Sequence, residues 1–173
     1  MVLRMNDRTR IVFVLCGIAL CGFPAMLAGQ ERSFRTSDRN LLGPGEVLTA
    51  GLTFVDVDGD GDRDAIVANG RHWPEANEVF LNNVSGLFTV GYPLGVELAT
   101  TYAVPSGDLD GDGDVDVIVA NDRAENWVYL NDGHGRFELA WAVTSDVEPA
   151  RSARLHDLDS DGDLDLLVTN RGN

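Results

Sequence analysis

The sequence predicts an all-β fold made of about three copies of one unit of roughly 50 residues, the last copy incomplete. An acidic run recurs three times, short β-branched apolar segments follow each run, and no segment near these runs keeps a helical period. Each complete unit should be an antiparallel sheet of four strands, the size of one β-propeller blade. We therefore expect a partial β-propeller of about three four-stranded blades.

The repeat is clearest in the acidic runs, which begin at Asp56, Asp108 and Asp157, 52 and 49 residues apart. The segments that follow also match: Ala65–Asn69 with Val117–Asn121 and Leu166–Asn170, then Val79–Asn83 with Val128–Asp132. Because this last pair is offset by 49 residues, the three-residue difference must lie between Asn69 and Val79. A match with one cleanly placed insertion is not a product of chance.

The strands of each unit follow from local composition. Lead-in strands are expected at Leu48–Val55, Tyr102–Ser106 and Ser152–His156. The apolar segments after the acidic runs suit strands that are buried on both faces. Second strands, bounded by Asn-rich turn signals, are expected at Glu78–Leu81 and Asn126–Leu130, and third strands at Leu87–Val90 and Arg136–Ala140.

The third unit stops at Asn173, where the other two units continue into their outer strands. Its sheet would lack those strands, and an open edge near Leu164–Thr169 would be exposed. Two interpretations stay open, a fragment of a longer protein and a chain that assembles with others through this edge. The missing strands favour the fragment.

The N-terminus has the pattern of a secretory signal peptide. A basic start, Met1–Arg10, precedes the uncharged apolar stretch Ile11–Ala28. The alternative is a retained membrane anchor, since about 18 apolar residues can just span a bilayer. Glycines and a proline inside the stretch favour cleavage, so we expect a signal peptide at 1–29, a linker at 30–45 and a repeat region at 46–173 with units near 46–98, 99–147 and 148–173.

Cleavage would leave a secreted or extracytoplasmic protein, in a periplasm or at a cell surface, with no stable membrane insertion. Both cysteines, Cys16 and Cys21, lie in the apolar stretch, so the exported part has no disulfide. The chain carries 28 acidic and 13 basic residues, a net charge of −15, and all of its basic residues are arginine. This charge disfavours nucleic acid and anionic lipid as partners.

The acidic runs have the pattern of calcium loops. Oxygen donors stand at positions 1, 3, 5, 7 and 9, with glycine at position 6 for a sharp bend. We assign carboxylates at 1, 3, 5 and 9 and the backbone carbonyl at 7. Hard oxygen donors without His or Cys select Ca²⁺, and about three ions are expected per chain. The candidate ligands are Asp56, Asp58, Asp60, Asp62 and Asp64; Asp108, Asp110, Asp112, Asp114 and Asp116; and Asp157, Asp159, Asp161, Asp163 and Asp165.

Two other interpretations of the runs are weaker. An EF-hand needs a glutamate at position 12, where this sequence has Val67, Val119 and Val168 inside expected strands. A solvated acidic turn that binds nothing would hold its carboxylates at about 5 Å, where each pair repels by roughly 3 kcal/mol at an effective dielectric constant of about 20. Such a loop would open without a divalent ion.

The pattern D-x-D-x-D-G-x-x-D, a following V-x-N segment and the turn Leu130–Phe137 (L-N-x-G-x-G-x-F) resemble the FG-GAP/VCBS repeat family over about Glu46–Asn173. The resemblance implies blades of an integrin-α-like β-propeller with Ca²⁺ in the Asp loops. Ser160 departs from the glycine of the other two loops, at a position that is not a ligand. Such propellers usually have about seven blades, and this chain has fewer than three complete ones.

We expect an exported calcium-binding module for protein or glycan interaction and adhesion, with self-association or further repeats through the open edge. The alternative is a non-catalytic propeller part of a secreted polysaccharide-active enzyme. No catalytic residue is expected, because the histidines, at 72, 134 and 156, show no partner spacing. The tryptophans, at 73, 127 and 141, could pack between repeats or stack on sugars, and packing is the more frequent use.

Overall fold

Every regular element in the described part of the chain is a β-strand, as the sequence predicts. The computed structural model describes residues 42, 47–83, 86–143 and 147–172, all within the compact unit Thr36–Asn173. The predicted signal peptide, and the predicted linker apart from Leu42, lie outside these residues. In the part that is described, no helix has the length and apolar character needed to cross a membrane.

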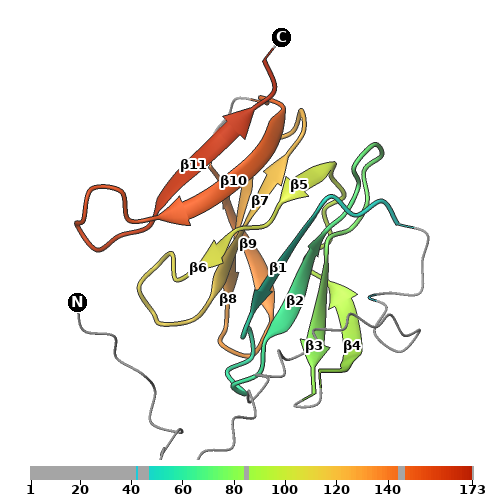
Figure 1. Cartoon of the computed structure of the whole chain (residues 1–173), viewed down its shortest axis with the longest axis vertical. Coiled ribbons are helices and arrows are strands. Elements are labelled where there is room, and N and C mark those ends of the chain that lie inside the picture. The colour runs from blue at the N-terminus through green and yellow to red at the C-terminus, as the bar shows by residue number, and fades with distance from the viewer. Residues whose placement is uncertain (1–41, 43–46, 84–85, 144–146, 173) are drawn as a thin grey trace, which may run out of the picture. The chain divides into compact units, whose positions relative to one another are not determined.

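The strands form three antiparallel groups, which we call repeats 1, 2 and 3 (Figure 1). Repeat 1 is a four-stranded sheet in chain order, β1 (Gly51–Val55), β2 (Asp64–Ala68), β3 (Glu78–Asn82) and β4 (Phe88–Pro93). Repeat 2 comprises β5 (Thr101–Ala103), β6 (Ser106–Gly107), β7 (Asp116–Asn121), β8 (Trp127–Asn131) and β9 (Phe137–Ala142). Repeat 3 is the pair β10 (Ala150–His156) and β11 (Asp165–Asn170).

The register of pairing is the same in all three repeats. The last pair before the acidic loop is Val55 with Asp64 in repeat 1. The corresponding pairs are Gly107–Asp116 in repeat 2 and His156–Asp165 in repeat 3. Positions that share a place in this register are called equivalent below.

The later strands confirm where the insertion lies. Ala65 pairs with Phe80 in repeat 1, and the equivalent Val117 pairs with Tyr129 in repeat 2. The first members of these pairs are 52 residues apart in the sequence and the second members 49, so the difference falls in the β2–β3 connection.

The lead-in strand of repeat 2 departs from the expectation of one continuous strand over Tyr102–Ser106. It is divided into β5 and β6, with Val104 and Pro105 between them. Proline has no N–H to donate to a neighbouring strand, although its carbonyl still accepts a hydrogen bond from the amide of Ile118 at 2.9 Å. The strand is therefore interrupted because Pro105 has no backbone N–H group to donate to β7.

The central strands of repeats 1 and 2 are packed on both faces. All residues of β2 and β7 are buried, as expected for strands covered on both faces. In repeat 1, Ile66 and Ala68 pack toward repeat 2, while Ala65 and Val67 belong to a separate cluster with Phe80. By contrast, β11 has no fully buried residue.

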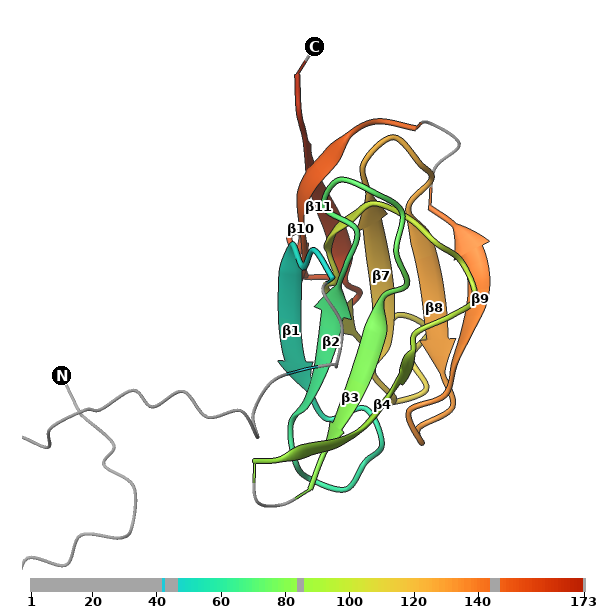
Figure 2. The ribbon, with the colours of Figure 1, turned by 90° about the vertical axis from the view of Figure 1, so that its right-hand side faces the viewer.

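The core lies mainly between the repeats. One cluster joins residues of repeats 1 and 2, and a second, centred on Ala120, Ala150 and Ala153, joins repeats 2 and 3. Figure 2 shows the sheets of repeats 1 and 2 standing one behind the other. Trp127 is half-buried and packs against the first cluster, so this tryptophan packs between repeats, whereas Trp73 and Trp141 are exposed.

Candidate metal centre

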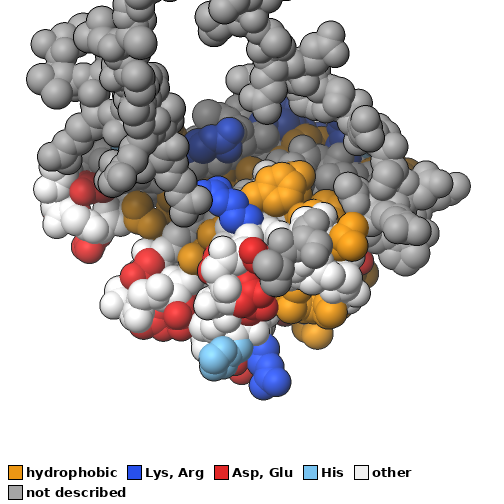
Figure 3. Space-filling view, turned by 60° about the horizontal axis from the view of Figure 1, so that its bottom comes forward, with side chains coloured by type: hydrophobic (Ala, Val, Ile, Leu, Met, Phe, Trp, Pro, Cys, Tyr) orange, Lys and Arg blue, Asp and Glu red, His pale blue; other side chains and the backbone are white. Residues whose placement is uncertain are grey.

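The three acidic runs form three hairpin loops, here called the first (Asp56–Asp64), second (Asp108–Asp116) and third (Asp157–Asp165) Asp loops. Each joins a lead-in strand to the following central strand, and all three project toward the lower left of Figure 1. Figure 3, which brings the bottom forward, shows acidic side chains gathered on this face. Position 12 falls inside β2, β7 and β11, so the loops have no EF-hand geometry.

The first aspartate of each loop fixes the loop backbone. Asp56 accepts hydrogen bonds from the amides of Gly59 at 2.8 Å and Gly61 at 2.9 Å, through its two oxygens. Gly61 has a φ of 93°, a conformation that glycine adopts without steric cost. The equivalent aspartates make the same two bonds in the second loop, at 2.8 and 3.1 Å, and in the third, at 2.7 and 3.1 Å.

The last aspartate ties the loop to the sheet. Asp64 is fully buried and accepts from the amides of Val57 at 2.9 Å and Asn82 at 2.8 Å. Asp116, also fully buried, accepts from the amides of Leu109 and Asn131, both at 2.9 Å. These bonds connect the first loop to β3 and the second loop to β8, the strands that follow the central strands.

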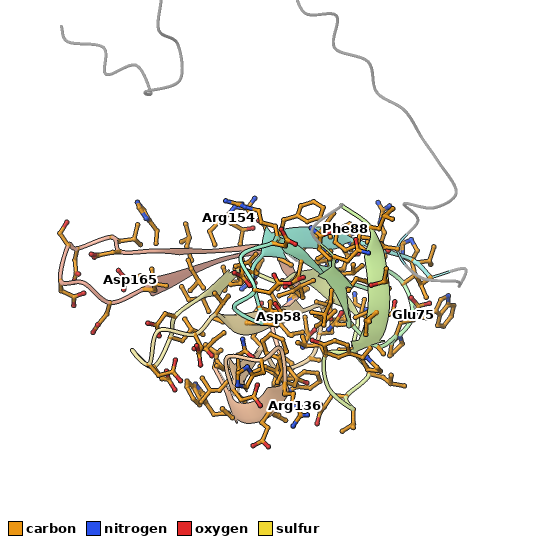
Figure 4. All side chains as sticks on the ribbon, turned by 90° about the horizontal axis from the view of Figure 1, so that it is seen from below. Asp58, Glu75, Phe88, Arg136, Arg154 and Asp165 are labelled. Atoms are coloured by element: carbon orange, nitrogen blue, oxygen red, sulfur yellow. The ribbon has the colours of Figure 1, made fainter. Side chains whose placement is uncertain are left out.

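In each loop the structure brings three carboxylates together, at positions 1, 3 and 9. One oxygen from each lies within 4.8 Å of the other two. The groups are Asp56, Asp58 and Asp64; Asp108, Asp110 and Asp116; and Asp157, Asp159 and Asp165. Figure 4 labels Asp58 and Asp165, which belong to the first and third groups.

The structure does not place the position-5 and position-7 side chains in these groups. Asp60, at position 5, accepts a hydrogen bond from the amide of Asp62 at 2.8 Å. Asp112 and Asp161 accept the equivalent bonds at 2.9 and 3.0 Å. The position-7 side chains were not expected to bind, because the prediction there concerns the carbonyls of Asp62, Asp114 and Asp163.

Burial and charge both act on the last aspartate. Desolvation raises the pKa of Asp64 above its ordinary value, although the amides of Asn82 and Val57 oppose the shift. The negative charges of Asp58 and Asp60 raise this pKa further. The pKa of Asp116 is raised in the same way, first by burial, with Asp110 and Asp112 adding their charges. Without a cation, the buried carboxylate of these two loops is therefore energetically unfavourable.

The turn between β8 and β9 connects the first two loops, and sequence reasoning did not anticipate it. The carboxylate of Asp114 lies beside Gly133, where an added Cβ would come within 2.6 Å of it. On the other side of the turn, Tyr92 donates to the carbonyl of Gly135 at 2.5 Å. The side-chain amide of Asn131 donates to the carbonyl of Val57 in the first loop at 2.8 Å.

The repeated Leu-Asn pair could have revealed part of this arrangement. Asn82 and Asn131 occupy equivalent positions at the ends of β3 and β8, and their amides hold the last aspartates of the first two loops. The sequence shows the repetition of these asparagines, but it gives no sign of the acceptor in the neighbouring repeat.

The donor set fits a hard divalent cation. Each group offers carboxylate oxygens only, and none of the three groups contains a cysteine or a histidine. A carboxylate has about four lone-pair positions, so the hydrogen bonds to backbone amides leave acceptor capacity on each aspartate. Oxygen-only donors of this kind favour Ca²⁺ over zinc or copper.

Comparison with known proteins gives one family. The family model described as an FG-GAP-like repeat matches residues 108–168, which run from the start of the second Asp loop to β11. A search of curated proteins finds no match to this chain. Repeat 1 lies outside the matched region, but it shares the register and the loop hydrogen bonds of repeat 2.

Proposed function

We propose that this chain, which carries an FG-GAP repeat over residues 108–168, is an exported calcium-binding module of the β-propeller type that acts by binding other molecules. The observation that carries the proposal is the convergence of three carboxylates in each of three loops that share one hydrogen-bond pattern. A surface acidic turn would not need buried carboxylates, but Asp64 and Asp116 are fully buried.

The metal would be held by positions 1, 3 and 9 of each loop, with the position-5 carboxylates and the position-7 carbonyls as the further predicted donors. Bound Ca²⁺ would supply positive charge and fix the loop, without entering a reaction. In the first loop, Asp56 and Asp64 hold the loop backbone and its attachment to β3 in place. The sites would therefore stabilise the sheets rather than perform catalysis.

We propose a protein or a glycan as the partner and an extracytoplasmic location, in which calcium is available to the loops. FG-GAP repeats are typically extracellular, which supports the location. The exposed aromatic side chains of Trp73 and Trp141 provide surface that can stack on sugars or anchor a protein. We propose no catalytic role for the chain.

Isothermal titration calorimetry of EDTA-treated protein tests the metal assignment. We expect about three Ca²⁺ per chain, with Mg²⁺ and Zn²⁺ as comparison ions that bind more weakly to these donors. A single site, or none, would overturn the assignment. For the binding role, glycan and protein binding screens should be run beside an assay for polysaccharide cleavage, and turnover by the purified chain would contradict a purely binding function.

A further inference from the structure

The outward face of repeat 3 exposes apolar side chains at positions that are buried in repeat 1. Val57 and Ile66 face repeat 2 and are 1% and 0% exposed. The equivalent residues of repeat 3 are Leu158 and Leu167, which are 60% and 55% exposed. Repeat 3 therefore presents the kind of face that repeat 1 uses to hold repeat 2.

The outward face of repeat 1 corresponds to the face with which repeat 2 contacts repeat 1. Val104, in repeat 2, is 2% exposed and belongs to the cluster between repeats 1 and 2. Its equivalent in repeat 1 is Leu52, which is 46% exposed. Phe54 is exposed as well, and its ring lies 6.1 Å from that of Phe88. Figure 4 labels Phe88, and Leu42 packs on Ala65, Val67 and Phe80 in the same repeat.

The contact between repeats 1 and 2 shows how such faces meet. Apolar residues of β7 and β8 pack on Val57 and Ile66, and polar bonds complete the contact. Thr53 donates its hydroxyl to the carbonyl of Val104 at 2.8 Å. The side-chain amide of Asn131 donates to Val57 in repeat 1 at 2.8 Å and to Val115 in its own repeat at 3.1 Å.

Asn82, the equivalent of Asn131, makes only half of this arrangement. Its side-chain amide donates to the carbonyl of Arg63 in its own repeat at 3.1 Å, which matches the bond from Asn131 to Val115. In the described residues it has no acceptor equivalent to Val57. The carbonyl that would take this place is that of Leu158, the equivalent of Val57 in repeat 3.

We propose that the outward face of repeat 1 in one copy of this chain binds the outward face of repeat 3 in a second copy. Leu167 and Leu158 would pack against the side of Leu52 and Phe54, in the way that repeat 1 packs against repeat 2. The contact is heterologous, because two different surfaces meet, so further copies can add to either end. The inference goes beyond the proposed calcium function, and no metal ligand takes part in the contact.

A second copy fits these faces better than an unrelated partner does, because the outward faces of repeats 1 and 3 each reproduce one half of the interface that exists between repeats 1 and 2. The chain carries a net charge of −15, so copies repel one another at long range. The faces themselves are apolar, and salt screens this repulsion beyond about 8–10 Å at ionic strengths near 0.1–0.15 M. Association should therefore strengthen with added salt.

The test uses two full-length variants that each block one end, Phe54→Asp and Leu167→Asp. Analytical ultracentrifugation in calcium should show concentration-dependent oligomers for wild type and a loss of association on the order of tenfold or more for each variant. An equimolar mixture of the two variants should form a one-to-one dimer and nothing larger, because one free face remains on each. Val96→Asp, at an exposed valine outside both faces, is the matched control and should associate like wild type.

Circular dichroism of each variant confirms that it is folded, and Leu158→Asp replaces Leu167→Asp if that variant does not fold. The apolar stretch Ile11–Ala28 is present in every variant. Association through this stretch would therefore occur in each single variant as well as in the mixture. Calorimetric titration of each variant with Ca²⁺ separates this contact from calcium binding, because neither Phe54 nor Leu167 belongs to a metal group. A wild type that stays monomeric at high concentration, single variants that associate like wild type, or a mixture that forms no dimer would each overturn the proposal.

Discussion

Ser160 occupies a backbone position that is unusual for a residue other than glycine. Its φ is 65°, and the equivalent residues of the other loops are Gly59 and Gly111, with φ of 75° and 81°. In this left-handed region the Cβ atom approaches the following carbonyl oxygen, at a cost of roughly 1–2 kcal/mol. The third loop therefore keeps the shape of the first two at an energetic cost that they do not have.

Replacing this serine should stabilise the protein. Ser160→Gly is expected to raise the free energy of unfolding by about 1 kcal/mol, since glycine adopts this φ without strain. Chemical denaturation in calcium measures the change. Gly111→Ala is the matched reverse substitution, because its Cβ would meet nothing within 4 Å and only backbone strain is added. If both variants unfold like wild type, the strain assigned to this position is wrong.

Tyr92 is a second single residue with a measurable property. Burial raises the pKa of its hydroxyl to about 12, and the charges of Asp64, Asp58 and Asp132 add to the shift. The neutral hydroxyl also donates to the carbonyl of Gly135, across the repeat boundary. The folded state therefore favours the protonated tyrosine more than the unfolded state does.

The stability that this tyrosine contributes should be complete below its ordinary pKa of 10.0 and lost as the pH rises toward about 12. An ultraviolet absorbance titration of wild type minus Tyr92→Phe should give a tyrosinate midpoint well above 10.0. Thermal unfolding should show that the variant loses less stability than wild type over this alkaline range. A difference titration centred at the ordinary value would show that Tyr92 is not buried as described.

At the scale of the element, each Asp loop is a hairpin whose first and last aspartates hold its backbone, while the position-5 aspartate bonds only within the loop. This makes Asp112 a selective probe, since Asp108, Asp110 and Asp116 still converge without it. Its side chain accepts a hydrogen bond from the amide of Asp114 at 2.9 Å.

Because the loop spacing predicts position 5 as a ligand, we expect Asp112→Ala to remove one calcium ion per chain and leave the other two. Loss of one site lowers the free energy of unfolding by about 2.7 kcal/mol when calcium is at a hundredfold excess over Kd. Calorimetric titration counts the ions, and thermal unfolding in calcium gives the stability. Leu109→Val, a conservative change in the same loop, should alter neither quantity. A variant that still binds the full number of ions would show that position 5 is not a ligand.

The hairpins were predictable because their signals are local. Alternating acids with a glycine at position 6, followed by β-branched residues, place the central strand Ala65–Asn69 within one residue of the observed β2. The break between β5 and β6 was missed, because it depends on the single proline at 105 and its partner across the sheet.

The candidate metal site was predictable only where its contacts lie within one loop. Spacing along one loop predicts that the carboxylates at positions 1, 3, 5 and 9 meet. The structure groups those at positions 1, 3 and 9 and leaves the position-5 carboxylate out of the group. Spacing could not predict that Asn131 reaches Val57, or that Gly133 lies beside Asp114, since these contacts depend on how separate sheets stack. Contacts across repeats have no local signature in the sequence.

At the scale of the whole molecule, calcium and folding should be coupled. Three sites at a hundredfold excess over Kd would contribute about 8 kcal/mol, comparable to the total stability of many domains. In EDTA we expect loss of most of the β-sheet circular dichroism, and in calcium its recovery. Magnesium at the same concentration is the control and should restore less of the signal. A chain that keeps its full β-sheet signal in EDTA would contradict the structural role of the metal.

The longer β2–β3 connection has a consequence for how this architecture can be altered. It contains Trp73, which is 72% exposed, and it lies at the end of repeat 1 away from the first Asp loop. Its three extra residues leave the strand register and the loop hydrogen bonds the same as in repeat 2. The connection between the second and third strands therefore differs in length between repeats 1 and 2, whereas the Asp loop spans nine residues in all three repeats. For protein engineering, peptides or tags belong in this connection, between His72 and Trp73, where the scaffold already accommodates an insertion.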